Sequence, residues 1–430
     1  MYQRSAVALS LFILAWIHTA GRLQGVTIQA AQVGDWPSWR GHHRDGISRE
    51  TGLLDSWVEN EPRELWRAQG FGSGFSSVAI VDGKLYTMGN LDDQTKIVVA
   101  DIQQGKVLWT AAVGGGSAPN CTPTIDDGRV FGLSHAGDLL CADAKTGAEI
   151  WRKNFAADFG GKMMSGWGYS ESPLVDGDRL IVTPGAPAAM LASLDKRTGK
   201  VLWQAAMPAN AGAAGQDGAG YSSVVISHGA GVKQYLQLVG RGLISVDAKS
   251  GKFLWQYNRI ANGTANIPTP LIKGDYVFAS SGYSDGGSAL LKLTRENAAV
   301  TPQEIYYKRF NELQNHHGGM ILMGDYVYMG HGHNKSFPVC FELLTGRDMW
   351  RPGRGPGAGS AAVVCADDHL YFRYENGVMA LIEATPDDYN LKGSFQIAIN
   401  NGKSWPHPVI SNGRLYLRDQ GELICYDIGG

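Results

Sequence analysis

Hydrophobic positions along the chain form short runs that break at a turn dipeptide and resume with aromatic residues, as in residues 76–89 (SSVAIVDGKLYTMG) and 123–133 (PTIDDGRVFGL). An apolar run on each side of Asp-Gly or Asn-Gly predicts a β-hairpin, because these residues readily adopt the positive φ of a tight turn. Eight such turns recur at roughly regular spacing: Asp82-Gly83, Asp127-Gly128, Asp176-Gly177, residues 228–231, Gly274-Asp275, Gly324-Asp325, Asp367-Asp368 and Asn412-Gly413.

A second pattern follows most of these hairpins and ends in tryptophan. Its copies are DIQQGKVLW (101–109), DAKTGAEIW (143–151), DKRTGKVLW (195–203), DAKSGKFLW (247–255) and the looser ELLTGRDMW (342–350). Each copy reads as a turn with glycine at the positive-φ position, followed by a strand. The interval from Trp255 to Trp350 is about twice the others, which predicts a degenerate copy between them.

The two patterns together make a four-stranded unit of about 40 to 50 residues, and such units bury both faces only by stacking on neighbours. We therefore predict an all-β chain folded as an eight-bladed β-propeller. The last unit, at residues 414–430, has no tryptophan-bearing fourth strand, whereas residues 62–68 (PRELWRA) form a fourth strand with no unit before it. Pairing of the strand that contains Trp66 with residues 421–427 would close the ring and remove a free sheet edge.

The amino-terminal residues resemble an export signal. Arg4 precedes an apolar run of about 12 residues, from Ala6 to Ile17, which is shorter than the roughly 20 residues that span a bilayer. We expect residues 1–31 to be a signal peptide, residues 32–61 an entry segment and residues 62–430 the propeller. The mature chain would then be periplasmic or extracellular, without a membrane span; an uncleaved anchor is the alternative.

Composition narrows the classes of partner. The 430 residues carry 38 basic and 40 acidic side chains, a net charge of −2, with no basic run, which argues against nucleic acid. The five cysteines include no CxxC motif and no adjacent pair, so we expect buried apolar residues rather than disulfides. We expect a monomer.

The D-x-x-T-G-x-x-L-W units resemble the pyrroloquinoline quinone (PQQ)-like β-propeller repeat over residues 62–430, and the chain is similar to exported bacterial proteins of this type. The fifth unit departs from the pattern with tyrosines in residues 303–310, the seventh ends near Phe395, and the eighth borrows Trp66. The resemblance implies two contrasting functions. Some family members are PQQ- and calcium-dependent quinoprotein dehydrogenases, whereas others resemble the propeller subunit of the outer-membrane β-barrel assembly machinery, which binds partners.

The repeat places the loops that enter each inner strand on one face of the ring, around the channel. There we expect aromatic residues to wall a ligand and charged or histidine side chains to supply polar contacts. The candidate ligand-binding residues are Trp167, Tyr169, Glu171, Asp217, Tyr221, His316, His317, Arg373, Trp405, His407 and Arg418. Such residues can also simply fill the channel and bond to one another.

Three functional hypotheses remain open. The first is a non-catalytic binding or scaffold propeller that recognises a protein, a small molecule or a sugar at the channel face. The second is a PQQ- and calcium-dependent dehydrogenase, although the family's quinone site includes a disulfide between adjacent cysteines, which this chain lacks, together with a tryptophan and Glu, Asn and Asp calcium ligands. The third is hydrolysis or lyase chemistry with His316, His317 or His407 as the base.

A metal site is a further possibility. His331 and His333 are spaced by two residues, which on a strand would place both imidazoles on one face. A third ligand is not evident nearby.

Overall fold

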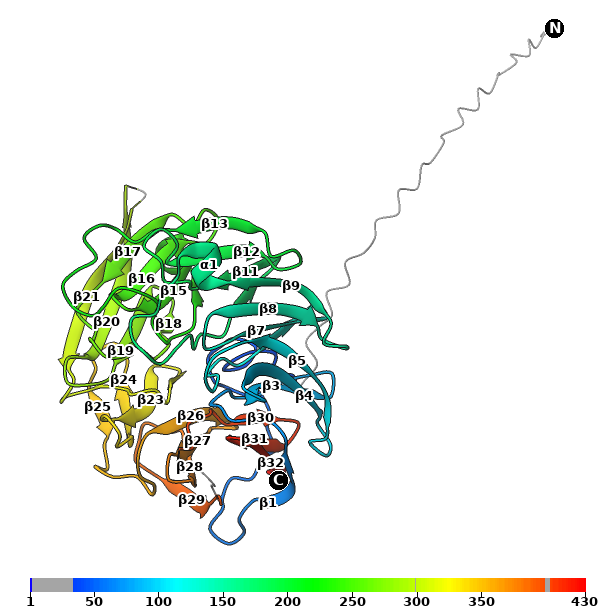
Figure 1. Ribbon diagram of the computed structural model, residues 1–430. Coiled ribbons are helices and arrows are strands. Elements are labelled where there is room, and N and C mark those ends of the chain that lie inside the picture. The colour runs from blue at the N-terminus through cyan, green and yellow to red at the C-terminus, as the bar shows by residue number, and fades with distance from the viewer. Residues whose placement is uncertain (2–33, 298, 399–402) are drawn as a thin grey trace. The chain divides into compact units, whose positions relative to one another are not determined.

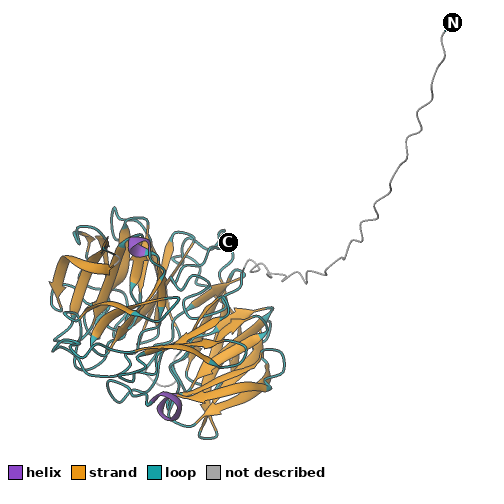
Figure 2. Ribbon diagram, turned by 90° about the horizontal axis from the view of Figure 1, so that it is seen from above, coloured by secondary structure: helices purple, strands orange, loops and turns teal. Residues whose placement is uncertain are grey.

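The computed structural model describes Met1 and residues 34–297, 299–398 and 403–430. The predicted signal peptide lies outside the described residues. From residue 34 onward the described residues form one compact unit whose regular secondary structure is almost entirely β-strand, with a five-residue helix α1 (Phe155–Phe159) and one 3-10 turn (Gly229–Gly231) (Figure 2). Its strands form eight four-stranded antiparallel sheets, which confirms the predicted propeller. In Figure 1 the colour runs once around this ring.

The first four blades follow one another in the chain, each with its strands in sequence order from the channel outward. Blade 1 contains β2 (Ala79–Val81), β3 (Lys84–Leu91), β4 (Gln94–Asp101) and β5 (Val107–Gly114), and blade 2 contains β6 (Thr124–Asp126), β7 (Arg129–Leu133), β8 (Asp138–Asp143) and β9 (Glu149–Asn154). Blade 3 contains β10 (Leu174–Asp176), β11 (Arg179–Val182), β12 (Leu191–Asp195) and β13 (Val201–Ala205), and blade 4 contains β14 (Val225–Ser227), β15 (Gln234–Val239), β16 (Gly242–Asp247) and β17 (Phe253–Tyr257).

The other four blades complete the ring. Blade 5 contains β18 (Leu271–Lys273), β19 (Tyr276–Ser281), β20 (Gly287–Glu296) and β21 (Ala299–Arg309), and blade 6 contains β22 (Met320–Met323), β23 (Tyr326–His331), β24 (Phe337–Glu342) and β25 (Asp348–Trp350). Blade 7 contains β26 (Ala361–Ala366), β27 (His369–Tyr374), β28 (Val378–Glu383) and β29 (Leu391–Gln396), and blade 8 contains β30 (Val409–Ser411), β31 (Arg414–Asp419), β32 (Glu422–Asp427) and β1 (Arg63–Gln69).

The strand β1 closes the ring, as predicted. It pairs antiparallel with β32, with Trp66 opposite Cys425 and Arg67 opposite Ile424. The two ends of the propeller therefore meet in one sheet (Figure 1). Closure leaves no open sheet edge between the first and last blades.

The repeated Asp-x-x-Thr-Gly sequence is explained by contacts within the turn and with the preceding blade. In blade 3, Oδ1 of Asp195 accepts hydrogen bonds from the backbone N–H and the hydroxyl of Thr198, both at 2.8 Å. Gly199 has a φ of 70°, and a Cβ there would lie 2.8 Å from the indole of Trp151 in blade 2. Glycine is therefore needed here for two reasons: the turn has a positive φ, and the neighbouring tryptophan leaves no room for a side chain.

The same contact between a tryptophan of one blade and a turn glycine of the next recurs around the ring. Trp109 lies against Gly147, Trp203 against Gly251 and Trp66 against Gly105. In blade 5 the degenerate copy uses Tyr306, whose ring lies against Gly346. An aromatic side chain from one blade therefore packs on the turn of the next.

The entry segment lies across the channel. It contacts residues in or beside the inner strands of six blades, including blade 8, where the hydroxyl of Ser411 donates to the carbonyl of Gly34. Trp36 pairs with Ile80, Pro37 accepts from Ile125, Arg44 donates to Ser172, Arg40 donates to Met320, and Ser48 donates to Cys365. These contacts close one end of the channel and leave space at the other.

All five cysteines are buried and in the free thiol form, as predicted. Burial raises the pKa of Cys121 to about 12, so it is a neutral thiol that behaves as a small apolar residue. Within the described part of the chain, no helix has the length and apolar character needed to cross a membrane.

Candidate functional site

A pocket of about 660 Å³ lies over the plugged channel, and loops from all eight blades contribute to it. Trp39 of the entry segment also lines it. The remaining lining residues are Phe75, Asn120, Trp167, Ser170, Tyr221, Ser223, Ala265, Ile267, Pro268, Thr269, Tyr283, His316, His317, Gly319, His333, Asn334, Glu375, Lys403, Trp405 and His407. The volume is within the range of about 300–1,000 Å³ that small-molecule sites occupy.

Trp405 is the centre of one aromatic wall. Its ring lies 4.7 Å from that of Phe75 and 5.1 Å from that of His317, measured between ring centroids. The ammonium of Lys403 lies 4.9 Å from the Trp405 ring centroid, a cation–π contact. These contacts hold the indole in place before any ligand arrives.

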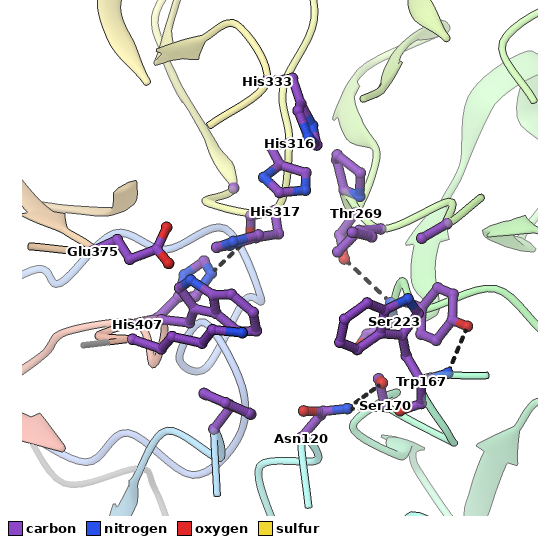
Figure 3. Close-up of a pocket in the computed structure, with 18 of the residues that line it drawn as sticks. Asn120, Trp167, Ser170, Ser223, Thr269, His316, His317, His333, Glu375 and His407 are labelled. Atoms are coloured by element: carbon purple, nitrogen blue, oxygen red, sulfur yellow. Dashed lines mark hydrogen bonds between the residues drawn. The ribbon is translucent and has the colours of Figure 1, made fainter. Parts of the chain in front are cut away.

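Trp167 comes from blade 3, on the other side of the pocket from Glu375 and His407 (Figure 3). Its backbone N–H donates to the hydroxyl of Tyr221 at 3.3 Å, and its carbonyl accepts from Asn120 at 3.2 Å. The side chain is nevertheless 54% exposed. An indole exposed at the mouth of an apolar cavity is typical of a binding surface.

Three histidines meet at the blade 6 side of the pocket (Figure 3). The ring of His316 lies 4.3 Å from that of His333 and 4.5 Å from that of His317, between centroids. Nδ1 of His316 is 2.6 Å from the hydroxyl of Ser360, and its Nε2 is 3.4 Å from that of Tyr283. The ring of His316 is therefore held at both nitrogens.

Burial keeps these histidines neutral. It lowers the pKa of His316 to about 2, with a further contribution from repulsion by His317 and His333. It also lowers the pKa of His317 and of His407 to about 3. At neutral pH these rings therefore act as uncharged donors, acceptors and aromatic surfaces, because a buried imidazolium without a carboxylate partner is costly.

Several buried polar atoms at the pocket have no partner among the described residues. They are Nε2 of His317, Nδ1 of His333 and Nε1 of Trp405. A buried polar atom without a hydrogen bond costs about 1–3 kcal/mol.

Six of the eleven predicted residues line the pocket: Trp167, Tyr221, His316, His317, Trp405 and His407. The two arginines do not. Arg373 is fully buried and donates to the carbonyl of Pro406 at 3.0 Å, between Trp405 and His407 in the chain. Arg418 donates to the carbonyls of Phe71 and Gly72 at 3.2 and 2.9 Å. Through these hydrogen bonds the arginines fix the backbone of the loops that carry the aromatic wall, on the side away from the pocket.

The other three predicted residues also lie outside the pocket lining. Tyr169 is buried and donates to the carbonyl of Pro184 at 2.9 Å. Glu171 is 2% exposed and accepts from the N–H and hydroxyl of Thr183 at 2.5 and 2.6 Å. Burial raises the pKa of Glu171 to about 7. Both residues connect neighbouring strands and do not face a ligand.

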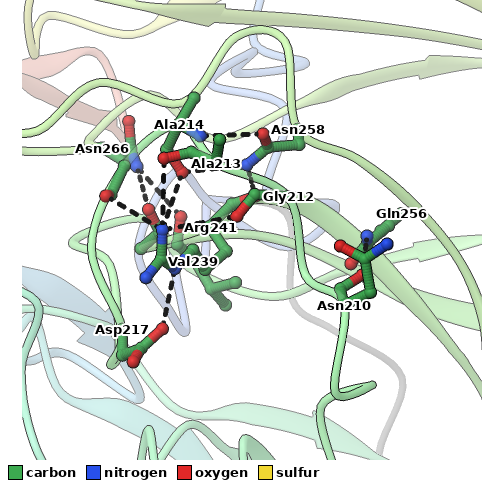
Figure 4. Close-up of polar contacts among 12 residues, drawn as sticks. Asn210, Gly212, Ala213, Ala214, Asp217, Val239, Arg241, Gln256, Asn258 and Asn266 are labelled. Carbon is green, nitrogen blue, oxygen red and sulfur yellow. Dashed lines mark hydrogen bonds and ion pairs between the residues drawn. The ribbon is translucent and has the colours of Figure 1, made fainter.

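Asp217 pairs with Arg241, whose Nε donates to Oδ1 at 2.7 Å (Figure 4). Arg241 also points its Nη1 at the carbonyls of residues 212–215. Asn258 binds the same loop, donating to the carbonyl of Ala214 at 2.9 Å. Asp217 therefore helps to fix the loop between blades 3 and 4.

His331 and His333, the predicted metal-binding pair, lie in different surroundings. The strand β23 ends at His331, so the prediction that both imidazoles share one face of a strand is wrong. Nδ1 of His331 accepts from the backbone N–H of Gln314 at 3.2 Å, whereas His333 lines the pocket. The described residues include no group of three or more His, Cys, Asp or Glu side chains placed to hold a metal ion.

Sequence reasoning missed part of the lining. Phe75, Ser223, Thr269 and Lys403 lie two to six residues before the start of an inner strand. A systematic reading of the residues before every inner strand would have found them. Trp39 carried no such signal, because the entry segment has no strand periodicity.

A family model described as "Outer membrane protein assembly factor BamB" matches residues 56–134 and 120–352 of the chain. The match covers well over half of its length. The chain belongs to this BamB family.

Two curated BamB proteins are similar in sequence. The one from Shewanella oneidensis is 23% identical over 258 residues, which is 57% of this chain and 60% of the relative. The one from Burkholderia pseudomallei is 26% identical over 281 residues, which is 63% of this chain and 65% of the relative. The match thus spans less than two thirds of each relative's own length.

Solved structures share the fold of this BamB-family chain. BamB from Moraxella catarrhalis aligns with a TM-score of 0.58 at 15% identity, over 85% of this chain and 97% of that one. Quinohemoprotein alcohol dehydrogenase from Comamonas testosteroni aligns with a TM-score of 0.64 at 13% identity, over 94% and 82% of the two chains. A europium-containing methanol dehydrogenase aligns with a TM-score of 0.65 at 12% identity, over 91% of each chain. At these identities the likeness concerns the fold.

The pocket of the BamB-family chain does not fit PQQ and calcium. Calcium prefers several carboxylate and carbonyl oxygens, but among the described residues Glu375 is the one carboxylate in the lining. PQQ carries carboxylates, yet in the part of the lining that the structure describes Lys403 is the one side chain with a permanent positive charge. The nearby Arg373 and Arg418 donate to backbone carbonyls. The residues present therefore suit an uncharged ligand better than an anionic quinone with a metal.

Proposed function

We propose that this chain is an exported, non-catalytic binding propeller whose ligand occupies the pocket at the channel face. The observation that carries the proposal is the pocket itself, about 660 Å³ in volume, formed in advance and lined by aromatic side chains. The polar side chains of Glu375 and Asn334 in its lining are available to orient a ligand. The scaffold around them is a closed ring with a plugged channel.

The character of the histidines supports binding over catalysis. A general base works best when its pKa is near the operating pH. His316, His317 and His407 have pKa values lowered to about 2 or 3 by burial. Neutral rings with so little basicity are suited to hydrogen bonding and stacking with a ligand.

The family supports the same proposal. Its model carries the name of an assembly factor, as do the two curated relatives. An assembly factor acts by binding other molecules, so a binding role agrees with membership of this family. The occupant of the pocket is then either a free small molecule or a segment of a partner protein that inserts between Trp405 and Trp167.

A ligand panel tests the proposal. Intrinsic tryptophan fluorescence and thermal unfolding of the purified chain would be followed with neutral oligosaccharides, short peptides, choline, and PQQ with calcium. We expect one uncharged class to bind at micromolar concentration, and Trp405→Ala to weaken binding by about tenfold or more because it removes the aromatic wall.

A variant on the outer surface provides the control. Leu108 is 48% exposed on the outer strand β5, so Leu108→Ala should bind like the unchanged chain. Absence of binding by every class, or binding that survives Trp405→Ala, would contradict the proposal. Quinone uptake with turnover of alcohols or sugars would replace it with the dehydrogenase function.

Export is tested separately by cell fractionation with amino-terminal sequencing. We expect the protein in the periplasm or the medium, starting near residue 32, because the apolar run from Ala6 to Ile17 is of signal-peptide length. Recovery from the cytoplasm with Met1 intact would contradict export. Recovery in a membrane fraction that resists carbonate would indicate an uncleaved anchor.

A further inference from the structure

The charges that line the pocket are balanced. Glu375 and Lys403 contribute one of each sign, and the four lining histidines include three whose pKa burial depresses to about 2 or 3. A ligand with a net charge would thus find no excess of the opposite charge. Burying an unpaired charge is costly, so this lining favours an uncharged molecule.

The aromatic surfaces come from widely separated blades. Trp405 enters from blade 8 and Trp167 from blade 3, and both line the same cavity. The Trp167 side chain is 54% exposed, so its ring can still cover a ligand surface. Flat indole faces pack well against a rigid molecule that has an apolar face and a polar edge.

The polar side chains of the lining define the other half of the ligand. Glu375 adds a carboxylate whose Oε2 accepts from the N–H of Ser360 at 3.3 Å, and the exposed Asn334 adds an amide whose Oδ1 accepts from the Ser360 hydroxyl at 3.3 Å. A hydroxyl group both donates and accepts, so it can bond to a carboxylate and to either end of an amide. A purely apolar ligand would displace water from these groups without replacing its hydrogen bonds.

From these three observations we infer that the pocket binds a neutral saccharide, a short oligosaccharide whose ring faces pack on Trp405 and Trp167 and whose hydroxyls bond to Glu375 and Asn334. The inference rests on the proposed function and names the class of its ligand. A sugar ring combines a C–H face with a rim of hydroxyls, which matches indole faces bordered by polar side chains. A saccharide attached to a larger exported molecule would satisfy the same contacts.

The test uses the full purified chain on an array of neutral oligosaccharides, followed by calorimetry with each glycan that is retained. We expect at least one neutral glycan to bind with an affinity that changes little between low and high salt, since no net charge is paired. Trp167→Ala should weaken this binding by about tenfold, the factor that 1.4 kcal/mol represents.

Two further variants separate the saccharide site from a general effect on the fold. Glu375→Gln keeps the shape but removes the charge, so it should weaken a glycan that donates hydroxyls to the carboxylate while leaving the unfolding temperature unchanged. Leu108→Ala, on the outer strand β5, should bind the glycan like the unchanged chain.

The outcomes distinguish this inference from the proposed function. If no neutral glycan binds but a peptide or choline binds in a Trp167-dependent way, the inference of a saccharide ligand is overturned while the proposed binding function stands. Glycan binding that survives both Trp167→Ala and Trp405→Ala would overturn the location. Failure of all classes of ligand would overturn both.

Discussion

Replacing Trp151 with alanine is expected to lower the free energy of unfolding by about 3–5 kcal/mol, the usual cost of truncating a large buried aromatic residue. Trp151 is 9% exposed and lies on Gly199 of the next blade. Its Nε1 also donates to the carbonyl of Lys196 at 3.1 Å. The substitution removes both the packing between two blades and this hydrogen bond. Urea unfolding followed by circular dichroism measures the change.

Trp203→Ala provides the matched comparison. Trp203 occupies the same position in blade 3 and lies against Gly251, but its indole is only partly buried and its Nε1 has no partner among the described residues. We expect a smaller loss than for Trp151→Ala. An equal loss of unfolding free energy in the two variants, or no loss in either, would show that packing of these tryptophans on the turn glycines does not stabilise the ring in the way described.

Acidification from pH 7 to pH 5 is expected to destabilise the protein by roughly 4 kcal/mol. Each of three imidazoles that are protonated only in the unfolded chain contributes about 1.4 kcal/mol per pH unit below pH 6.5, or about 6 kcal/mol in all, and protonation of Glu171, whose pKa burial raises to about 7, offsets about 2 kcal/mol of this. The pKa values of His316, His317 and His407 are lowered to about 2 or 3 in the folded chain, against about 6.5 when unfolded. Below pH 6.5 the unfolded chain therefore binds more protons. The stability is complete above that pH and is lost progressively as the pH falls toward 3.

Urea unfolding at pH 7 and pH 5 tests this dependence. His316→Gln keeps a side chain that can bond to the hydroxyl of Ser360 but cannot be protonated, so this variant should lose less stability on acidification. His228 is exposed, and His228→Gln should retain the full dependence. Equal pH dependence in all three proteins would contradict the burial of neutral imidazoles as its cause.

The site was only partly predictable. Trp167, Tyr221 and Trp405 were found because the repeat places the loops that carry them at the channel face. Arg373 and Arg418 were predicted to bind the ligand because charged residues beside a channel suggest binding, but they lie outside the pocket lining. In the structure their guanidinium groups satisfy backbone carbonyls of adjacent loops. Which side chain of a loop turns toward the cavity depends on such long-range partners.

Local sequence determined the fold of this protein. The turn dipeptides set the hairpins, and the Asp-x-x-Thr-Gly turn holds itself together through Asp195 and Thr198, with contacts three residues apart in the chain. Because each blade repeats this chemistry, the number of blades and the closure by β1 could be counted from the sequence. Neighbouring copies then bury the aromatic residues between blades.

Only the tertiary structure decided the pocket. Its floor depends on Trp39, in a segment without periodicity that Arg40 and Arg44 fasten to blades 6 and 3. Its walls join residues from eight blades, and its neutral histidines owe their low pKa values to burial by those walls. Burial, pairing and the direction of each loop are properties of the closed ring, so no single repeat carries them.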